Sequence, residues 1–145
     1  MCCYMLLILA LKEIVRVMMT IKRIDMALHV QQLCAENGIT VTYQSLDDPS
    51  PRYYAQPMRK LICIRPTKNT GYYVSALHEL GHILGDRQAP SISTLTKELY
   101  AWIWARQKAL VWTETAERVM RNAMNSYGWT NRQKEIWERK FPNVA

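Results

Sequence analysis

The pattern of apolar and polar positions divides this chain into a helix, a short sheet and a run of further helices. Residues 21–37 carry apolar side chains three or four positions apart, which predicts a helix ending at Asn37-Gly38. Ile39, Val41 and Tyr43 then alternate with threonines, as is typical of a strand. Two further strands are expected over residues 52–56 and 60–65, on either side of Pro57.

Four helices are expected after these strands. The helix over residues 72–84 has an apolar stripe, and Gly85 is placed to stop it. A polar loop over residues 85–95 follows, and the remaining helices are expected over 96–111, 113–127 and 131–140. This order predicts an α+β fold with an N-terminal helix, a small, mostly antiparallel sheet and C-terminal helices.

Length and composition favour a single domain over residues 1–145. With 145 residues and 49% hydrophobic content, the chain is long enough to bury one core. Residues 1–18 are expected to form a peripheral extension, and residues 113–145 a helical C-terminal extension. Residues 1–11 are almost wholly apolar but too short to span a bilayer, and they lack the features of a signal peptide. The sequence therefore gives no reason to expect a membrane protein.

Charge and cysteine content indicate which partners and which cellular compartment to expect. The formal net charge is +7, with the excess towards the C-terminal end. Such a charge permits an acidic partner, but without a nucleic-acid motif it favours a solvated basic surface over nucleic-acid binding. The cysteines form no C-x-x-C pair, so they are expected to be reduced thiols in a cytoplasmic protein. They are Cys2, Cys3, Cys34 and Cys63.

The most informative segment is His78-Glu79-Leu80-Gly81-His82, which spells H-E-x-x-H inside a predicted helix. Residues four apart lie on one helical face, so His78 and His82 are placed to hold one Zn²⁺. Glu79 lies beside them, within reach of a water activated at the metal. Gly81 keeps the helix slim where a neighbour would pack. The competing interpretation is that both histidines are surface or capping residues and Glu79 is a solvated charge.

A hydrolytic zinc site needs a third protein ligand. Glu98 is the best candidate, because it opens the next predicted helix after a loop long enough to reverse the chain. Asp86 would need a sharp local turn, and Glu114 and Glu117 lie one helix further on. The expected metal ligands are therefore His78, His82 and Glu98, with these alternatives left open.

This arrangement predicts metal-assisted hydrolysis with Glu79 as the catalytic base, which takes a proton from water and passes it to the leaving amine. A hydroxyl or imidazole near the metal would help to stabilise the oxyanion. Tyr72, Tyr73 and His29 are candidates for that role. Tyr100 is a weaker one, because two residues after Glu98 it points to roughly the opposite side of its helix.

Two motifs resemble those of the small ImmA/IrrE-type zinc metallo-endopeptidases of bacteria and phages. That family shows an A-H-E-L-G-H helix followed by a helix with an E-x-x-A-x-x-F-A pattern. Here residues 76–82 match the first motif with the alanine one place early. In the second motif Glu98, Ala101 and Ala105 match, and Trp104 fills the aromatic slot. The resemblance covers roughly residues 21–112.

The resemblance implies a zincin-like fold, a bound Zn²⁺ and cleavage of a cytosolic protein substrate such as a regulator or repressor. It implies His78, His82 and Glu98 as metal ligands and Glu79 as the catalytic carboxylate. Residues 60–65 are a plausible edge strand for the substrate, and the 85–95 loop is a candidate lid. The alternative function is a non-catalytic, zinc-stabilised module that binds protein or nucleic acid. The oligomeric state is left open.

Overall fold

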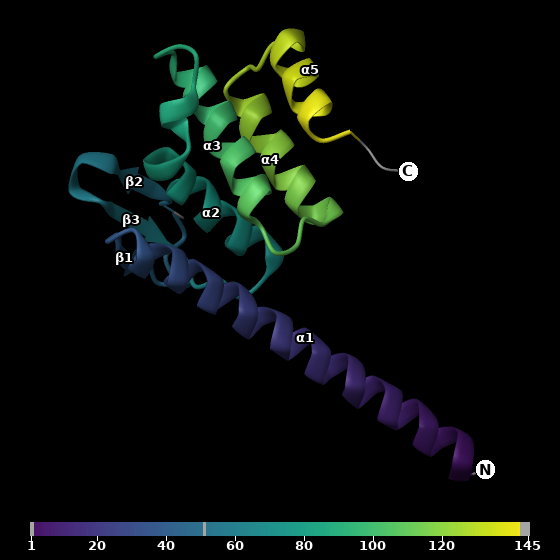
Figure 1. The fold of residues 1–145 in the computed structure, drawn as a ribbon. Helices are drawn as coiled ribbons and strands as arrows, with labels where there is room; N and C mark the ends of the chain where they lie inside the picture. Colours follow the sequence, from purple (N-terminus) through teal and green to yellow (C-terminus); the bar gives the residue numbers. More distant parts are fainter. Residues whose placement is uncertain (1, 51, 143–145) are drawn as a thin grey trace.

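A computed structural model of the chain, which describes residues 2–50 and 52–142, has an α+β architecture of five helices and one small sheet (Figure 1). The predicted coarse fold class is therefore confirmed. The helices are α1 (Cys2–Glu36), α2 (Thr70–Leu84), α3 (Thr94–Lys108), α4 (Glu114–Ser126) and α5 (Asn131–Lys140). The strands are β1 (Thr40–Tyr43), β2 (Tyr54–Gln56) and β3 (Leu61–Ile64).

The sheet is mixed, and its strand order is β1-β3-β2. β1 runs parallel to β3, with Thr40 opposite Leu61, whereas β2 runs antiparallel to β3. The prediction of a mostly antiparallel sheet was therefore wrong, because the chain passes through β2 before it returns to lie beside β1. The prediction of residues 60–65 as an edge was also wrong, since β3 is the central strand. The edges are β1 and β2.

Helix α2 lies at the centre of the fold, with the sheet and α1 on one side and α3 and α4 on the other (Figure 1). Ile62 and Ile64 of β3 are fully buried in the same core as the apolar side chains of α2. The helix begins two residues before the expected start, because the Asn69 side chain caps it by accepting a hydrogen bond from the Tyr72 backbone N–H. A central, capped helix is a rigid platform for its side chains.

The first helix is longer than the sequence pattern predicts. α1 runs without interruption from Cys2, and its last part buries Met26, Val30 and Cys34 against the domain. Gly38 follows in the left-handed conformation with φ of 64°, as expected for a residue that terminates a helix. Residues 2–18, expected to be peripheral, continue the same helix and project away from the rest of the molecule (Figure 1).

Cys34 and Cys63 are free thiols, whereas the side chains of Cys2 and Cys3 lie outside the described part of the chain. Within residues 2–50 and 52–142, no helix combines the length and the apolar character needed to cross a bilayer.

The two C-terminal helices are tied to the core by one carboxylate, that of Glu117 in α4. It accepts hydrogen bonds from Arg106 of α3 at 2.8 Å and from Arg121 at 2.9 Å. The indole N–H groups of Trp112 and Trp137 donate to the same carboxylate at 2.8 and 2.9 Å. Since charge-assisted hydrogen bonds are directional and comparatively strong, this cluster holds the first turn of α4 against α3 and α5.

Helices α2 and α3 cross in close contact because Gly81 of α2 and Gly85, its C-cap residue, leave room for α3. A Cβ atom on Gly81 would lie 2.4 Å from the Ala101 carbonyl oxygen, and one on Gly85 would lie 2.3 Å from the Trp104 Cβ. Gly85 is not left-handed, with φ of −116°. Its lack of a side chain is needed for this contact and not for a left-handed turn. The expectation that Gly81 faces a neighbouring helix is confirmed.

Replacement of Gly81 by alanine is therefore expected to destabilise the protein by about 1–3 kcal/mol, the usual cost of overpacking. Chemical denaturation of both proteins measures the difference. Gly71→Ala is the matched control in the same helix, because a Cβ there meets its nearest atom, Asn69 Oδ1, at 3.3 Å. Equal stability of wild type and Gly81→Ala would show that the crossing of α2 and α3 tolerates an added methyl group.

Candidate metal centre

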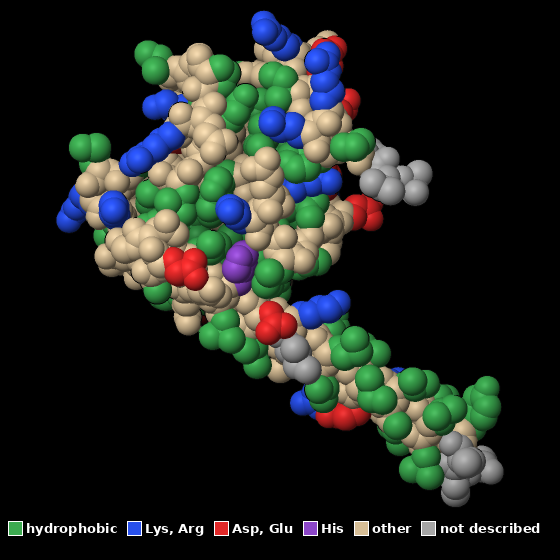
Figure 2. All heavy atoms as spheres, in the orientation of Figure 1, with side chains coloured by type: hydrophobic (Ala, Val, Ile, Leu, Met, Phe, Trp, Pro, Cys, Tyr) green, Lys and Arg blue, Asp and Glu red, His purple; other side chains and the backbone are tan. Residues whose placement is uncertain are grey.

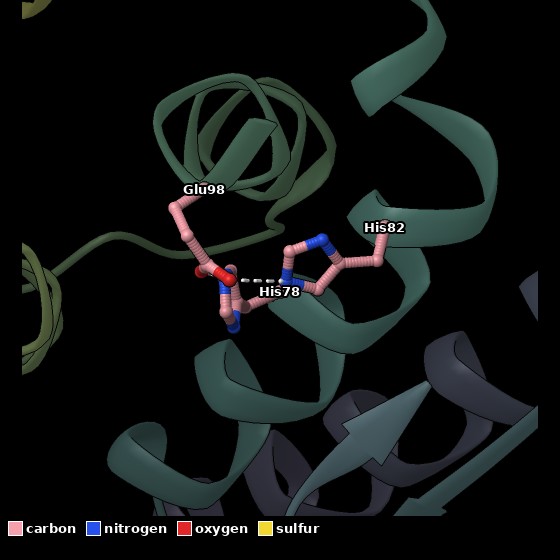
Figure 3. Close-up of side chains that lie close together, drawn as sticks. All are labelled: His78, His82 and Glu98. Carbon is pink, nitrogen blue, oxygen red and sulfur yellow. Dashed lines mark hydrogen bonds and ion pairs between the residues drawn. The ribbon is translucent and has the colours of Figure 1, made fainter. Parts of the chain in front are cut away.

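His78, His82 and Glu98 converge from two helices on one point (Figure 3). The histidines lie one turn apart on α2, and Glu98 lies near the start of α3. His78 Nε2 is 2.8 Å from Glu98 Oε2, and His82 Nε2 is 3.3 Å from Glu98 Oε1. The structure thus brings together the three residues that the sequence suggested as metal ligands.

The local fold explains why these side chains meet. After α2 ends at Leu84, a short 3₁₀ turn over Asp86–Gln88 reverses the chain, and the Ser93 side chain caps α3 by accepting from the Thr96 N–H. The helix then starts at Thr94, so Glu98 falls just beyond its first turn. The close crossing at Gly81 sets the distance between the histidines and Glu98.

The donor set fits a catalytic zinc ion. One ligand atom from each residue can be chosen so that all three lie within 4.8 Å of one another. In a tetrahedral zinc site, bonds of about 2.0–2.2 Å put neighbouring ligand atoms roughly 3.3 Å apart. The observed separations of 2.8 and 3.3 Å are close to that spacing. Two imidazoles and one carboxylate form one of the recurring three-ligand sets of hydrolytic zinc sites.

One side of the candidate centre is buried and shielded from water. His78 and Glu98 are 9% and 7% exposed. The imidazole of His78 stacks on the indole of Trp102, with ring centres 4.2 Å apart and planes 11° from parallel. Trp102 and Trp104 are both buried, which agrees with a packing role for these indoles. Water is therefore excluded from one side of the three converging side chains.

The titratable groups of the candidate site shift one another's pKa values. Burial would by itself raise the pKa of Glu98, but hydrogen bonds from His78 and His82 and their charges lower that pKa to about 2. Burial likewise opposes protonation of His78, yet its pKa is raised, because Glu79 and Glu98 both favour the imidazolium. The site is thus arranged to hold positive charge next to a fixed carboxylate.

Glu79 lies beside the ligands without belonging to them. Its carboxylate is 6% exposed, and Oε1 is 3.5 Å from Nδ1 of His78. His78 thus contacts Glu98 through Nε2 and Glu79 through Nδ1. A buried carboxylate next to a metal-ligand set, but outside it, is positioned to handle protons.

The alternative third ligands lie elsewhere. The Glu117 carboxylate accepts the hydrogen bonds from Arg106 and the other residues described above. Glu114 is exposed in the first turn of α4. Asp86 has Oδ2 at 3.6 Å from His82 Nδ1, on the far side of the ring from Glu98. A carboxylate in that place orients a ligating imidazole and raises its basicity.

Two of the suggested oxyanion donors, Tyr73 and His29, are engaged in hydrogen bonds of their own. Tyr73 is fully buried, and its hydroxyl lies 2.7 Å from Nδ1 of His29 while accepting a hydrogen bond from the Leu110 N–H. This pair joins α1 to α2. Tyr72 has the guanidinium of Arg65 over its ring, 5.9 Å from the centre. Tyr100 lines a pocket of about 290 Å³ with Pro90 and residues of α5.

Tyr127, which the sequence pattern did not single out, lies at the candidate site. It follows the last residue of α4 and is half exposed. Its pKa is raised, first by partial burial and then by its proximity to the Glu98 carboxylate, with a further contribution from Glu79. The phenol comes from the end of α4, a different segment from the helices that carry His78, His82 and Glu98, so local spacing gave no signal for it.

No protein-family model matches this chain, and neither a curated protein nor a solved structure matches it. The function is therefore inferred from the geometry of the site and from the two motifs that form it.

Replacement of Glu98 by glutamine is expected to weaken Zn²⁺ binding by at least roughly 100-fold. Loss of outer-shell partners alone costs 10–100-fold in metal affinity, and this change removes an anionic ligand. Isothermal titration of metal-free protein with zinc measures the effect. Glu114→Gln is the control, because it removes the same charge from an exposed position. Equal zinc affinity in wild type and Glu98→Gln would remove Glu98 from the ligand set.

Proposed function

We propose that the protein is a zinc-dependent metallo-endopeptidase that hydrolyses peptide bonds of a protein substrate. One observation carries the proposal: two imidazoles and a carboxylate converge within ligand distance of one another, with a separate buried carboxylate, Glu79, at their side. A purely structural zinc site usually has four protein ligands. In the part of the chain that the structure describes, the group contains three.

His78, His82 and Glu98 would hold the zinc ion, and Asp86 would orient the His82 ring from its other nitrogen. A bound Zn²⁺ would supply Lewis-acid activation of water and of the peptide carbonyl. The stack of Trp102 on His78 keeps that ring in place and excludes solvent behind it.

Glu79 is assigned the proton transfers. As a carboxylate it accepts a proton from the attacking water, and as a carboxylic acid it delivers that proton to the amine that leaves. Its burial and its position beside, not among, the ligating atoms support this role. Tyr127 is assigned a supporting role: its phenol lies near both Glu79 and Glu98 and is a hydrogen-bond donor for the oxygen on which negative charge develops.

Strand β2 is the edge best placed to align an extended substrate. Tyr53, which immediately precedes β2, has its pKa raised to about 12, chiefly by burial and in part by the charges of Tyr72 and Glu79. β2 also packs against α2, the helix that carries the proposed base. Peptides bind such edges by strand addition, in which main-chain hydrogen bonds supply affinity.

The substrate class follows from the resemblance to ImmA/IrrE-type peptidases and not from the site alone. A cytoplasmic regulator or repressor fits that resemblance. The fold proposed for the chain is zincin-like, with α2 and α3 carrying the metal ligands.

Replacement of Glu79 by glutamine is expected to lower proteolysis by roughly 10²–10⁴-fold, the usual contribution of a general base. Zinc binding is expected to persist, because no ligand is removed. Proteome-wide mapping of new protein N-termini in cells expressing wild type or Glu79→Gln measures cleavage, and metal analysis of the purified proteins measures zinc. Identical sets of new N-termini from the two proteins would refute the assignment of Glu79, and Glu114→Gln should cleave like wild type.

Replacement of Tyr127 by phenylalanine is expected to lower kcat by roughly 10²-fold with little change in KM, since it removes one donor to the developing oxyanion. Zinc affinity should stay within a few-fold of wild type. A peptide spanning a cleavage site found in cells is the substrate for the measurement. Tyr100→Phe is the matched control, because that phenol lines the pocket beside α5 instead. A Tyr127→Phe protein with unchanged kcat would exclude the phenol from the reaction.

A further inference from the structure

Basic side chains surround the N-terminus of α2, where α1 packs against it. Two adjoining cavities of about 160 and 470 Å³ lie at this junction. Arg23 and Lys68 line both cavities, and Lys22 lines the smaller one. We call these three side chains the junction cations. Figure 2 shows hydrophobic side chains over much of the projecting part of α1, and charged ones where this helix meets the rest of the molecule.

The helical spacing of α1 explains how two of these cations reach the junction. Lys22 and Arg23 lie four and three residues before Met26, so all three share one side of the helix. Met26 is buried in the core and lines the smaller cavity with both cations. The side of α1 that packs on the domain therefore carries two positive charges to the start of α2.

This placement is the opposite of what a helix N-terminus favours. The partial positive charge at that end attracts carboxylates, but the first turn of α2 has no acidic residue. The ion pairs found within residues 2–50 and 52–142 all join other side chains, so the junction cations have no carboxylate partner there. Asp25, the acidic residue nearest to Lys22 and Arg23 along α1, lines neither cavity. Like charges gathered in this way repel one another, and a bound anion would relieve that repulsion.

Backbone donors for such an anion are present at the same place. Asn69 and Thr70 line the smaller cavity. The Tyr72 N–H donates to the Asn69 side chain, and the first backbone hydrogen bond of the helix is that of the Tyr73 N–H. The N–H groups of Thr70 and Gly71 precede that bond and have no partner within the helix. Free N–H groups of this kind bind phosphate oxygens at the N-termini of other helices.

Thr67 gives a second, independent indication of a ligand. It is only 9% exposed and lines the larger cavity. In the described part of the chain its hydroxyl makes no hydrogen bond, and it is not among the fully enclosed polar atoms that lack a partner. The hydroxyl is therefore open to the cavity. Since a nearly buried hydroxyl without a partner is costly, an acceptor oxygen inside the cavity would stabilise this arrangement.

From this geometry we infer that the junction of α1 and α2 binds a phosphate group. The junction cations supply the charge, and Thr67 and the first N–H groups of α2 supply directed hydrogen bonds. The site is separate from the metal centre, because His78 lies eight residues after Thr70, about 12 Å further along α2. Phosphate binding is therefore independent of the proposed catalysis.

Titration of the isotopically labelled full chain with inorganic phosphate, followed by NMR of the backbone amides, tests the inference. The amide signals of Thr70 and Gly71 are expected to shift until they saturate. Their position in α2 distinguishes this site from phosphate bound at the metal centre. Sodium chloride at the same ionic strength is the control for screening, and it should leave these signals in place.

Two variants test the side chains. Lys68→Gln is expected to weaken phosphate binding by about tenfold or more, the usual effect of one charge-assisted hydrogen bond. Lys12→Gln is the matched control, because it removes the same charge from an exposed position of α1, about 15 Å before Lys22. Thr67→Val is expected to weaken binding by about two- to tenfold. Attraction by the junction cations alone would not produce this loss.

Vesicles distinguish a free phosphate from one carried by a lipid. Saturating shifts with inorganic phosphate would assign the site to a free phosphate group. Without them, binding to phosphatidic acid vesicles that Lys68→Gln weakens, and no binding to phosphatidylcholine vesicles, would assign it to a lipid head group. Absence of binding in both experiments would overturn the inference. Equal binding by Lys68→Gln and Lys12→Gln would overturn it as well, because the attraction would then not come from the junction.

Discussion

The close crossing of α2 and α3 is the constraint on which the rest of the site depends. Gly81 allows the Ala101 backbone to approach to a distance that no side chain would permit, and Gly85 does the same for Trp104. At this separation the Glu98 carboxylate reaches both imidazoles of α2. A wider crossing would leave these three polar side chains buried without their hydrogen-bond partners, which is costly in a low-dielectric interior.

The convergence of His78, His82 and Glu98 explains the electrostatics of the candidate centre. Burial alone would raise the pKa of Glu98, but the two histidines lower it to about 2, and the carboxylates of Glu79 and Glu98 raise the pKa of His78 above its usual value. A divalent cation satisfies the same carboxylate while leaving the imidazoles neutral, as metal ligands must be. In the proposed mechanism, Glu79 and Tyr127 would be the groups near a bound cation that accept and donate protons.

Local sequence patterns predicted the parts of this structure that depend on local physics. The H-E-x-x-H spacing placed two imidazoles on one helical face, and the loop after Gly85 suggested that Glu98 returns to them. Strand order was not predictable in this way, because the pairing of β1 with β3 depends on contacts between residues about 20 positions apart. Tyr127 was missed for the same reason: it follows the end of α4, a different segment from the helix that carries Glu98.

The central claim is that one zinc ion is held by two imidazoles and one carboxylate. Zinc K-edge X-ray absorption of the zinc-loaded full chain tests it most directly. The account predicts a first shell of about four nitrogen and oxygen atoms at roughly 2.0–2.2 Å, with the multiple-scattering signature of two imidazoles. Sulfur ligands at about 2.3 Å, or a shell without two imidazoles, would contradict it.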